Sequence, residues 1–166
     1  VGYRIERGAN RPAIWKKAGS EWKAIALPHE RVSVAGRALD INDSGEICGY
    51  VDLLGFEQPN RAPCVWIPNE SGGYQEGKIL PVPENAIGGC AIAINSGATV
   101  VGYYDDSKDR SIACYWARIG SDFQFFDLET AGVALIFGRV GNELIWTVLK
   151  ALLRPAEFSE SVTREV

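Results

Sequence analysis

Apolar and polar residues alternate in three short segments of this chain, each built around a tryptophan. In each segment a small residue and the tryptophan two positions later lie on the same face of an extended backbone. The three pairs are Ala13/Trp15, Cys64/Trp66 and Cys114/Trp116. Residues 12–16, 63–67 and 112–118 are therefore expected to be strands, because β-branched and aromatic residues fill them. A further strand is expected after each of them, at 22–27, 78–82 and 123–128.

The tryptophan segments belong to a repeat. Trp15, Trp66 and Trp116 are 51 and 50 residues apart, and a Gly-Tyr pair precedes each of them. The pairs are Gly2-Tyr3, Gly49-Tyr50 and Gly102-Tyr103. Residues 38–50 also align without gaps to residues 91–103. A period of this length is typical of proteins that stack one supersecondary unit after another.

A turn divides the aligned segment into a hairpin. Asn42 and Gly45 favour a tight turn, because asparagine binds its own backbone and glycine tolerates positive φ. The other copy has Asn95, but its glycine is Gly97, one place earlier in the repeat, so a different turn geometry is expected. One repeat thus contains four short strands, which is the content of a propeller blade.

These motifs resemble the HAF-repeat family of bacterial, extracellular repeat proteins. The family reads A-x-x-I-N-x-x-G-x-x-x-G-Y, a loop, an H-A-F-x-W strand and a Leu-Gly segment, and the resemblance covers residues 1–128. The first half of the motif is kept here, whereas Arg11-Pro-Ala, Ala62-Pro-Cys and Ile112-Ala-Cys replace H-A-F. The resemblance implies a propeller-like fold, a secreted or cell-surface location and no catalytic residues.

The expected fold is mainly β, with about three four-stranded antiparallel blades of an incomplete β-propeller in residues 1–130. Closed propellers contain about four to eight blades. A fragment of a longer protein, an oligomer that completes the ring and an open capped stack would each explain three blades. The absence of methionine from the chain favours the fragment.

Residues 131–166 form a C-terminal extension with a different pattern. Apolar residues from Leu144 to Leu153 recur at helical spacing, Asn142 suits an N-cap and Pro155 ends the pattern. A helix near 142–153 is therefore expected. It covers the last sheet or binds a partner, a second copy included, and the sequence leaves both roles open.

Composition narrows the partners. The chain has 166 residues and a net charge of −4, which gives no basic surface for nucleic acid. No apolar stretch is long enough for a membrane-spanning helix, and no signal peptide opens this chain. No glycine-rich phosphate loop is present, so no cofactor is expected.

Neither histidine nor cysteine indicates a metal site. His29 is the only histidine, and the four cysteines lack C-x-x-C spacing. Two of them, Cys64 and Cys114, occupy the place of Ala13, which favours buried free thiols. A disulfide between Cys48 and Cys64 is the alternative.

The segments after Gly-Tyr carry the candidate ligand-binding residues. Each combines acidic residues with an arginine just before the tryptophan strand, and functional residues concentrate on loops. The candidates are Arg11, Glu57, Arg61, Asp105, Asp106, Asp109 and Arg110. Structural arginine–carboxylate pairs are the alternative. Asp105, Ser107 and Asp109 resemble the start of a calcium loop, but its twelfth position is Trp116, so no metal is predicted.

The sequence favours a non-catalytic extracellular module that binds a protein or a glycan, or associates with itself through open blade edges or the C-terminal helix. A glycoside-active enzyme is the alternative, because a propeller can hold two carboxylates in a cleft. The available acids are Asp52, Glu57, Glu84, Asp105 and Asp106.

Overall fold

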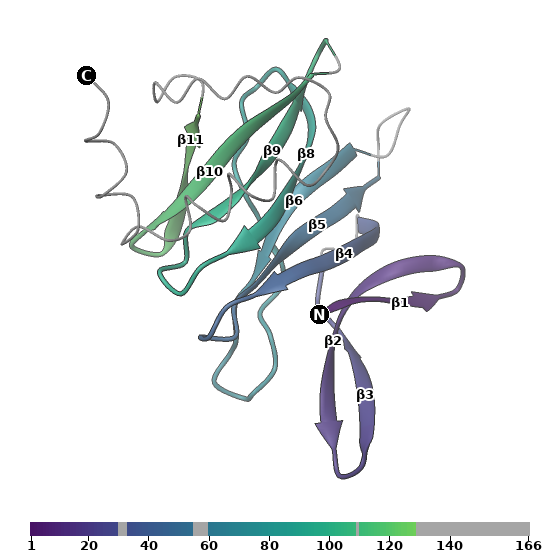
Figure 1. Cartoon of the computed structure of the whole chain (residues 1–166). Helices are drawn as coiled ribbons and strands as arrows, with labels where there is room; N and C mark the ends of the chain where they lie inside the picture. Colours follow the sequence, from purple (N-terminus) through teal and green to yellow (C-terminus); the bar gives the residue numbers. More distant parts are fainter. Residues whose placement is uncertain (30–32, 55–59, 109, 129–166) are drawn as a thin grey trace, which may run out of the picture.

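The computed structural model describes residues 1–29, 33–54, 60–108 and 110–128, and the described part is built of eleven strands with no helix. The strands are β1 Gly2–Glu6, β2 Ala9–Ala18, β3 Glu21–Ala26, β4 Ser33–Ile41, β5 Ile47–Leu53, β6 Asn60–Trp66, β7 Lys78–Ile79, β8 Ala86–Ile94, β9 Val100–Asp106, β10 Ser111–Ile119 and β11 Asp122–Asp127. They form three antiparallel sheets that follow one another along the chain (Figure 1).

Sheet 1 has the order β1-β2-β3, sheet 2 has β4-β5-β6-β7 and sheet 3 has β11-β10-β9-β8. The expectation of four strands in every repeat is wrong for sheet 1. The reason is that β1 holds the Gly-Tyr position, which belongs to the second strand in sheets 2 and 3. The mainly β fold is confirmed, whereas the whole extension 131–166, with the expected helix near 142–153, lies outside the described residues.

The first of the expected charged loops is largely strand, and the third begins as strand. β1 and β2 pair as far as Glu6 and Ala9, so only Arg7 and Gly8 form the turn, with φ of 51° and 81°. A two-residue turn with two positive φ angles matches the twist of its strands. In sheet 3, β9 likewise continues to Asp106. Charged residues there alternate between the two faces of a sheet, rather than gathering on one loop.

The sheets pack face to face through two apolar cores. The core between sheets 1 and 2 contains Ile14 and Leu27 together with residues of sheet 2 such as Ile47 and Trp66. The core between sheets 2 and 3 contains Val65, among others. Alternate residues of sheet 2 therefore enter different cores, as the two-residue period of a strand requires.

The tryptophans join each sheet to the one before it. Trp66 and Trp116 are fully buried, and their indole N–H groups donate hydrogen bonds to the carbonyls of Pro28 at 2.7 Å and Pro81 at 2.6 Å. Trp15 holds the same repeat position but is 36% exposed. Its sheet is the first of the three, so the described residues include no earlier sheet for it to contact.

The two asparagine turns have the same geometry, and the expected difference is wrong. In one turn Gly45 N–H donates to Asn42 O, and in the other Ala98 N–H donates to Asn95 O. The positive φ falls on Gly45 at 78° and on Ala98 at 57°. In both turns a backbone N–H donates to the asparagine side chain, and this closed turn imposes a left-handed conformation on its fourth residue. Glycine adopts that conformation without strain, whereas Ala98 is held in it by the turn.

Asn42 stabilises more than its own turn. Its side chain accepts a hydrogen bond from Glu46 N–H and donates to Glu46 Oε2 and to the carbonyl of Asn95, each at 2.9 Å. Among the described residues, the Asn95 side chain has one such bond, from Thr99 N–H.

We expect Asn42→Ala to lower the free energy of unfolding by about 2–3 kcal/mol and Asn95→Ala by about 1 kcal/mol, because each lost hydrogen bond contributes about 1 kcal/mol. Urea unfolding of the two variants measures the difference. Equal losses would contradict the bridging role of Asn42.

Candidate functional site

Five side chains form a row that crosses all three sheets. The Arg37 guanidinium lies over the ring of Tyr3 at 4.4 Å, and the Arg61 guanidinium lies over the ring of Tyr50 at 4.2 Å. Arg61 also approaches the hydroxyl of Tyr103, with 3.5 Å between Nη1 and the oxygen. We name Tyr3, Arg37, Tyr50, Arg61 and Tyr103 the Tyr–Arg row. Its tyrosines are those of the three Gly-Tyr pairs.

Strand register explains the row. On β4, Arg37 stands directly opposite Tyr50, and Arg61 on β6 stands diagonally across from it. Opposite and diagonal residues of an antiparallel pair project from the same face. The side chain of Arg61 is 43% exposed, so a ligand can reach this guanidinium.

Two carboxylates flank the row at equivalent positions. Asp52 lies opposite Arg61 on the neighbouring strand, with 3.9 Å between its Oδ1 and the Arg61 Nε. In sheet 3, Asp105 takes this position opposite Ser111, whose hydroxyl donates to Asp105 Oδ1 at 2.6 Å. The row thus combines hydrogen-bond donors with acceptors on one surface.

Burial controls the protonation of this surface. It raises the pKa of the Tyr50 and Tyr103 hydroxyls, which therefore stay protonated at neutral pH. Burial also raises the pKa of Asp52, and this effect outweighs the opposing one of Arg61 and Arg37. The surface thus presents neutral phenols and two guanidiniums as hydrogen-bond donors beside carboxylate oxygens as acceptors.

The arginines singled out by the sequence are not equivalent. Arg11, Arg61 and Arg110 precede their tryptophans by four, five and six residues, so they point to different places. Arg11 Nη1 lies 3.2 Å from both His29 Nε2 and the carbonyl of Ser33. Of the five candidates that the structure describes, only Arg61 and Asp105 belong to the row or flank it.

Asp106 and Arg110 form a closed structural pair. The buried carboxylate of Asp106 accepts two hydrogen bonds from the Arg110 guanidinium, at 2.8 and 2.7 Å, and two from the backbone N–H groups of Lys108 and Arg110. The structural alternative for this pair is confirmed. The other two candidates, Glu57 and Asp109, lie outside the described residues.

Acid is expected to weaken this pair. The hydrogen bonds from Arg110 hold the pKa of Asp106 below its usual range. The ionised Asp106 therefore makes its full contribution to the free energy of unfolding above the pKa of an unfolded aspartate, about 3.9. This contribution is lost as the pH falls through the lower pKa of the folded state. In thermal melts, the difference in melting temperature between wild type and Asp106→Asn should narrow below about pH 4. A constant difference down to pH ~2.5 would contradict this account.

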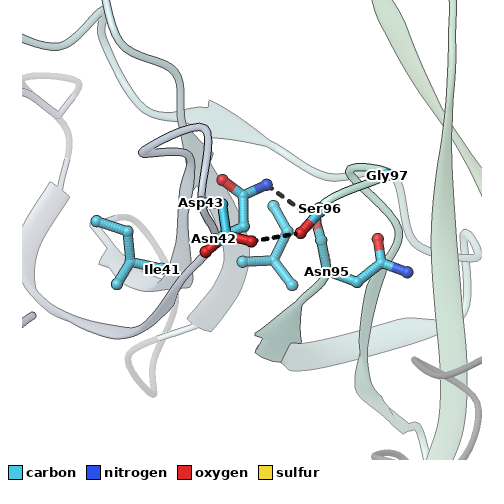
Figure 2. A pocket seen from close by; sticks show the side chains of 7 residues that line it. Ile41, Asn42, Asp43, Asn95, Ser96 and Gly97 are labelled. Atoms are coloured by element: carbon cyan, nitrogen blue, oxygen red, sulfur yellow. Dashed lines mark hydrogen bonds between the residues drawn. The ribbon is translucent and has the colours of Figure 1, made fainter.

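A shallow hollow of about 480 Å³ lies between the two asparagine turns (Figure 2). Its polar walls bind one another, since Asn42 Nδ2 donates to Asn95 O and Ser96 Oγ donates to Asp43 Oδ2. Asp40 Oδ2 also accepts a bond from Ile94 N–H. These hydrogen bonds connect sheets 2 and 3 at the hollow, and they leave few polar groups there to bind a ligand.

The four cysteines are buried free thiols, as expected, and the alternative disulfide is wrong. Cys48 enters the core between sheets 2 and 3, whereas Cys64 enters the core between sheets 1 and 2, so their thiols lie on opposite faces. Burial raises the pKa of Cys90 to about 12 and also raises the pKa values of Cys48 and Cys114. These thiols stay protonated at neutral pH.

The repeat motifs do not single out Arg37, and they indicate no binding role for the Gly-Tyr tyrosines. The third sheet has Cys90 at the position of Arg37, so no motif drew attention to the arginine. The part of the chain that the structure describes contains no group of three His, Cys, Asp or Glu residues suited to a metal. It also has no helix of the length and apolarity that crossing a membrane requires. No protein-family model, curated protein or solved structure matches the chain significantly.

Proposed function

We propose that this chain is a non-catalytic, extracellular binding module that takes a carbohydrate on the Tyr–Arg row. The row carries the proposal because one surface, shared by three sheets, presents guanidinium, phenol and carboxylate groups. Sugar hydroxyls both donate and accept hydrogen bonds, so they need donors and acceptors side by side. Arg61 with Asp52, and the neighbouring Tyr103 with Asp105, meet this need.

Rigidity of the row supports the same proposal. Its members project from paired strands, and cation–π contacts fix both guanidiniums. A ligand that binds preordered side chains loses less conformational entropy in the complex than one that must order them. Location outside the cell is carried over from the HAF-repeat resemblance and is part of the proposal.

The test is a screen of neutral and acidic oligosaccharides on an array, followed by calorimetric titration of those that bind. Arg61→Ala should weaken binding at least about tenfold, since Arg61 contacts two of the three tyrosines of the row, Tyr50 and Tyr103. Lys23→Ala, at an exposed position on β3, is the matched control and should bind as the wild type does. Failure of every saccharide to bind, or equal binding by Arg61→Ala, would refute the proposal.

A glycoside-active enzyme is the second candidate, and one observation favours it. Asp52 is half-buried with a raised pKa, as a general acid requires. Glu84, an acid without a counterpart in the repeat, is exposed, whereas Asp52 has Asp105 as its counterpart. If the wild type released reducing sugar from the same oligosaccharides and Asp52→Asn did not, the chain would be an enzyme rather than a binding module.

A further inference from the structure

The two guanidiniums of the Tyr–Arg row differ in the acceptors around them. Arg61 has the Asp52 carboxylate at 3.9 Å and the Tyr103 hydroxyl at 3.5 Å. Arg37, in contrast, donates no hydrogen bond to a described residue and forms no ion pair with one. Its cation–π contact with the Tyr3 ring leaves the N–H groups of the guanidinium unused. The row thus contains one arginine whose N–H groups have no acceptor among the described residues.

The open edge of Arg37 is the one that carries Nη1 and Nη2. Burial shuts off Nε, which is left without an acceptor, whereas the two Nη atoms remain accessible to solvent. Contact with the Tyr3 ring holds the guanidinium in place, with 4.4 Å between its carbon and the ring centroid. A guanidinium held in this way offers parallel N–H groups, a geometry that matches an oxyanion. An anion at this edge would therefore meet donors that are already oriented.

The carboxylates near Arg37 do not compensate its charge. Burial raises the pKa of Asp52, and Arg61 and Arg37 both oppose that rise, so two guanidiniums share this one carboxylate. On β4, Asp40 accepts a hydrogen bond from the backbone of β8, and on β1 Glu6 pairs with an arginine of its own strand. The second carboxylate that flanks the row belongs to sheet 3. Positive charge is therefore in excess at the end of the row that Arg37 occupies.

The equivalent position of sheet 3 shows that the repeat does not require a cation there. Cys90 takes the place of Arg37, and each of the two residues lies opposite the tyrosine of a Gly-Tyr pair. Burial raises the pKa of the Cys90 thiol to about 12, so this position holds a neutral side chain at neutral pH. Strand pairing alone therefore does not account for the arginine of sheet 2.

We infer that the carbohydrate bound by the Tyr–Arg row carries an anionic group, a carboxylate or a sulfate, which binds the Nη edge of Arg37. This inference rests on the proposed carbohydrate binding and adds the class of saccharide. Hydrogen bonds from a guanidinium to an oxyanion are stronger than those between neutral groups. The anionic sugar then lies over β4, and the hydroxyls of its neighbour lie beside Arg61 and Asp52. The row thereby distinguishes acidic from neutral saccharides.

Matched pairs of saccharides test the inference. Calorimetric titration compares uronic acid oligosaccharides with their methyl esters, and sulfated oligosaccharides with their desulfated forms. The wild type should bind the anionic member of a pair at least about tenfold more tightly than the neutral member. A preference among the uronic acid pairs identifies the group as a carboxylate, and a preference confined to the sulfated pairs identifies it as a sulfate.

Three variants locate the preference. Arg37→Gln should remove it, so that both members of a pair bind with similar constants, and a thermal melt shows whether this variant folds. Arg37→Lys keeps the charge but not the paired donors and should retain part of the preference. Lys23→Ala, which removes an exposed cation outside the row, should retain it in full.

The outcomes separate this inference from the proposed function. If the wild type bound both members of every pair equally, or a folded Arg37→Gln kept the full preference, the inference would be wrong and carbohydrate binding would stand. The wild-type comparison decides this without any variant. If no saccharide bound, the proposed function would fail and the inference with it.

Discussion

Gly49→Ala is expected to lower the melting temperature by about 6–12 °C, which corresponds to about 3 kcal/mol for a chain of this length. A Cβ atom on Gly49 would lie 2.0 Å from the carbonyl oxygen of Arg37, on the neighbouring strand β4. The obstacle is backbone, held by the strand pairing, so it cannot move away as a flexible side chain would. Gly102→Ala should behave alike, because its Cβ would lie 2.0 Å from the carbonyl oxygen of Cys90.

Gly2→Ala is the matched control, since Gly2 begins the same Gly-Tyr motif on a strand with no bulged neighbour. Its Cβ would meet the exposed ring of Trp15 at 3.1 Å, and a side chain can shift. We expect the melting temperature of Gly2→Ala to change by at most a few degrees. Thermal unfolding measures it, at a concentration where the wild type and the variants have the same oligomeric state. Similar losses at Gly2 and Gly49 would contradict the backbone explanation.

Loss of the buried ion pair between sheets 2 and 3 is the second large effect we expect. The side chain of Glu46 is 7% exposed, pairs with Arg118 and accepts a hydrogen bond from Asn42 Nδ2. Glu46→Ala should lower the free energy of unfolding by about 3 kcal/mol, because it leaves the half-buried Arg118 guanidinium without its carboxylate and removes one of the two acceptors of the half-buried Asn42 amide. Chemical denaturation at pH 7 measures the loss.

Two further variants test whether burial is the cause. Lys78 and Asp122 also join sheets 2 and 3, but the Asp122 side chain is 77% exposed, so Asp122→Ala should have a much smaller effect. Adding Arg118→Met to Glu46→Ala should recover part of the stability, since the unpaired charge is removed. Equal losses of unfolding free energy in Glu46→Ala and Asp122→Ala would show that burial is not the cause of the Glu46 effect.

The sequence repeats predicted the strands and their order but not the faces on which functional side chains lie. Trp66, Trp116 and the two asparagine turns follow directly from the aligned motifs. The three arginines, in contrast, stand four, five and six residues before their tryptophans, and one residue reverses the face of a strand. Hence Arg61 belongs to the Tyr–Arg row while Arg11 and Arg110 do not.

Other features depend on contacts that no local pattern records. The need for glycine at Gly49 comes from a bulge in β4, between Ala38 and Asp40, where the paired strands shift register. The left-handed conformation of Ala98 comes from the side chain of Asn95. Glu46 has Thr99 as its counterpart in the third sheet, so the repeat gave no reason to expect an ion pair there.

Alternate residues of sheet 2 enter the two cores, and each core is completed by one neighbouring sheet, sheet 1 or sheet 3. A chain of units coupled only to their nearest neighbours loses order from its ends inward. Sheet 1, with three strands and one described neighbour, should therefore open ahead of the middle sheet. Amide hydrogen exchange would show this as weaker protection in sheet 1 than in sheet 2. The amide of Leu27 should exchange long before those of Val65 and Ile47.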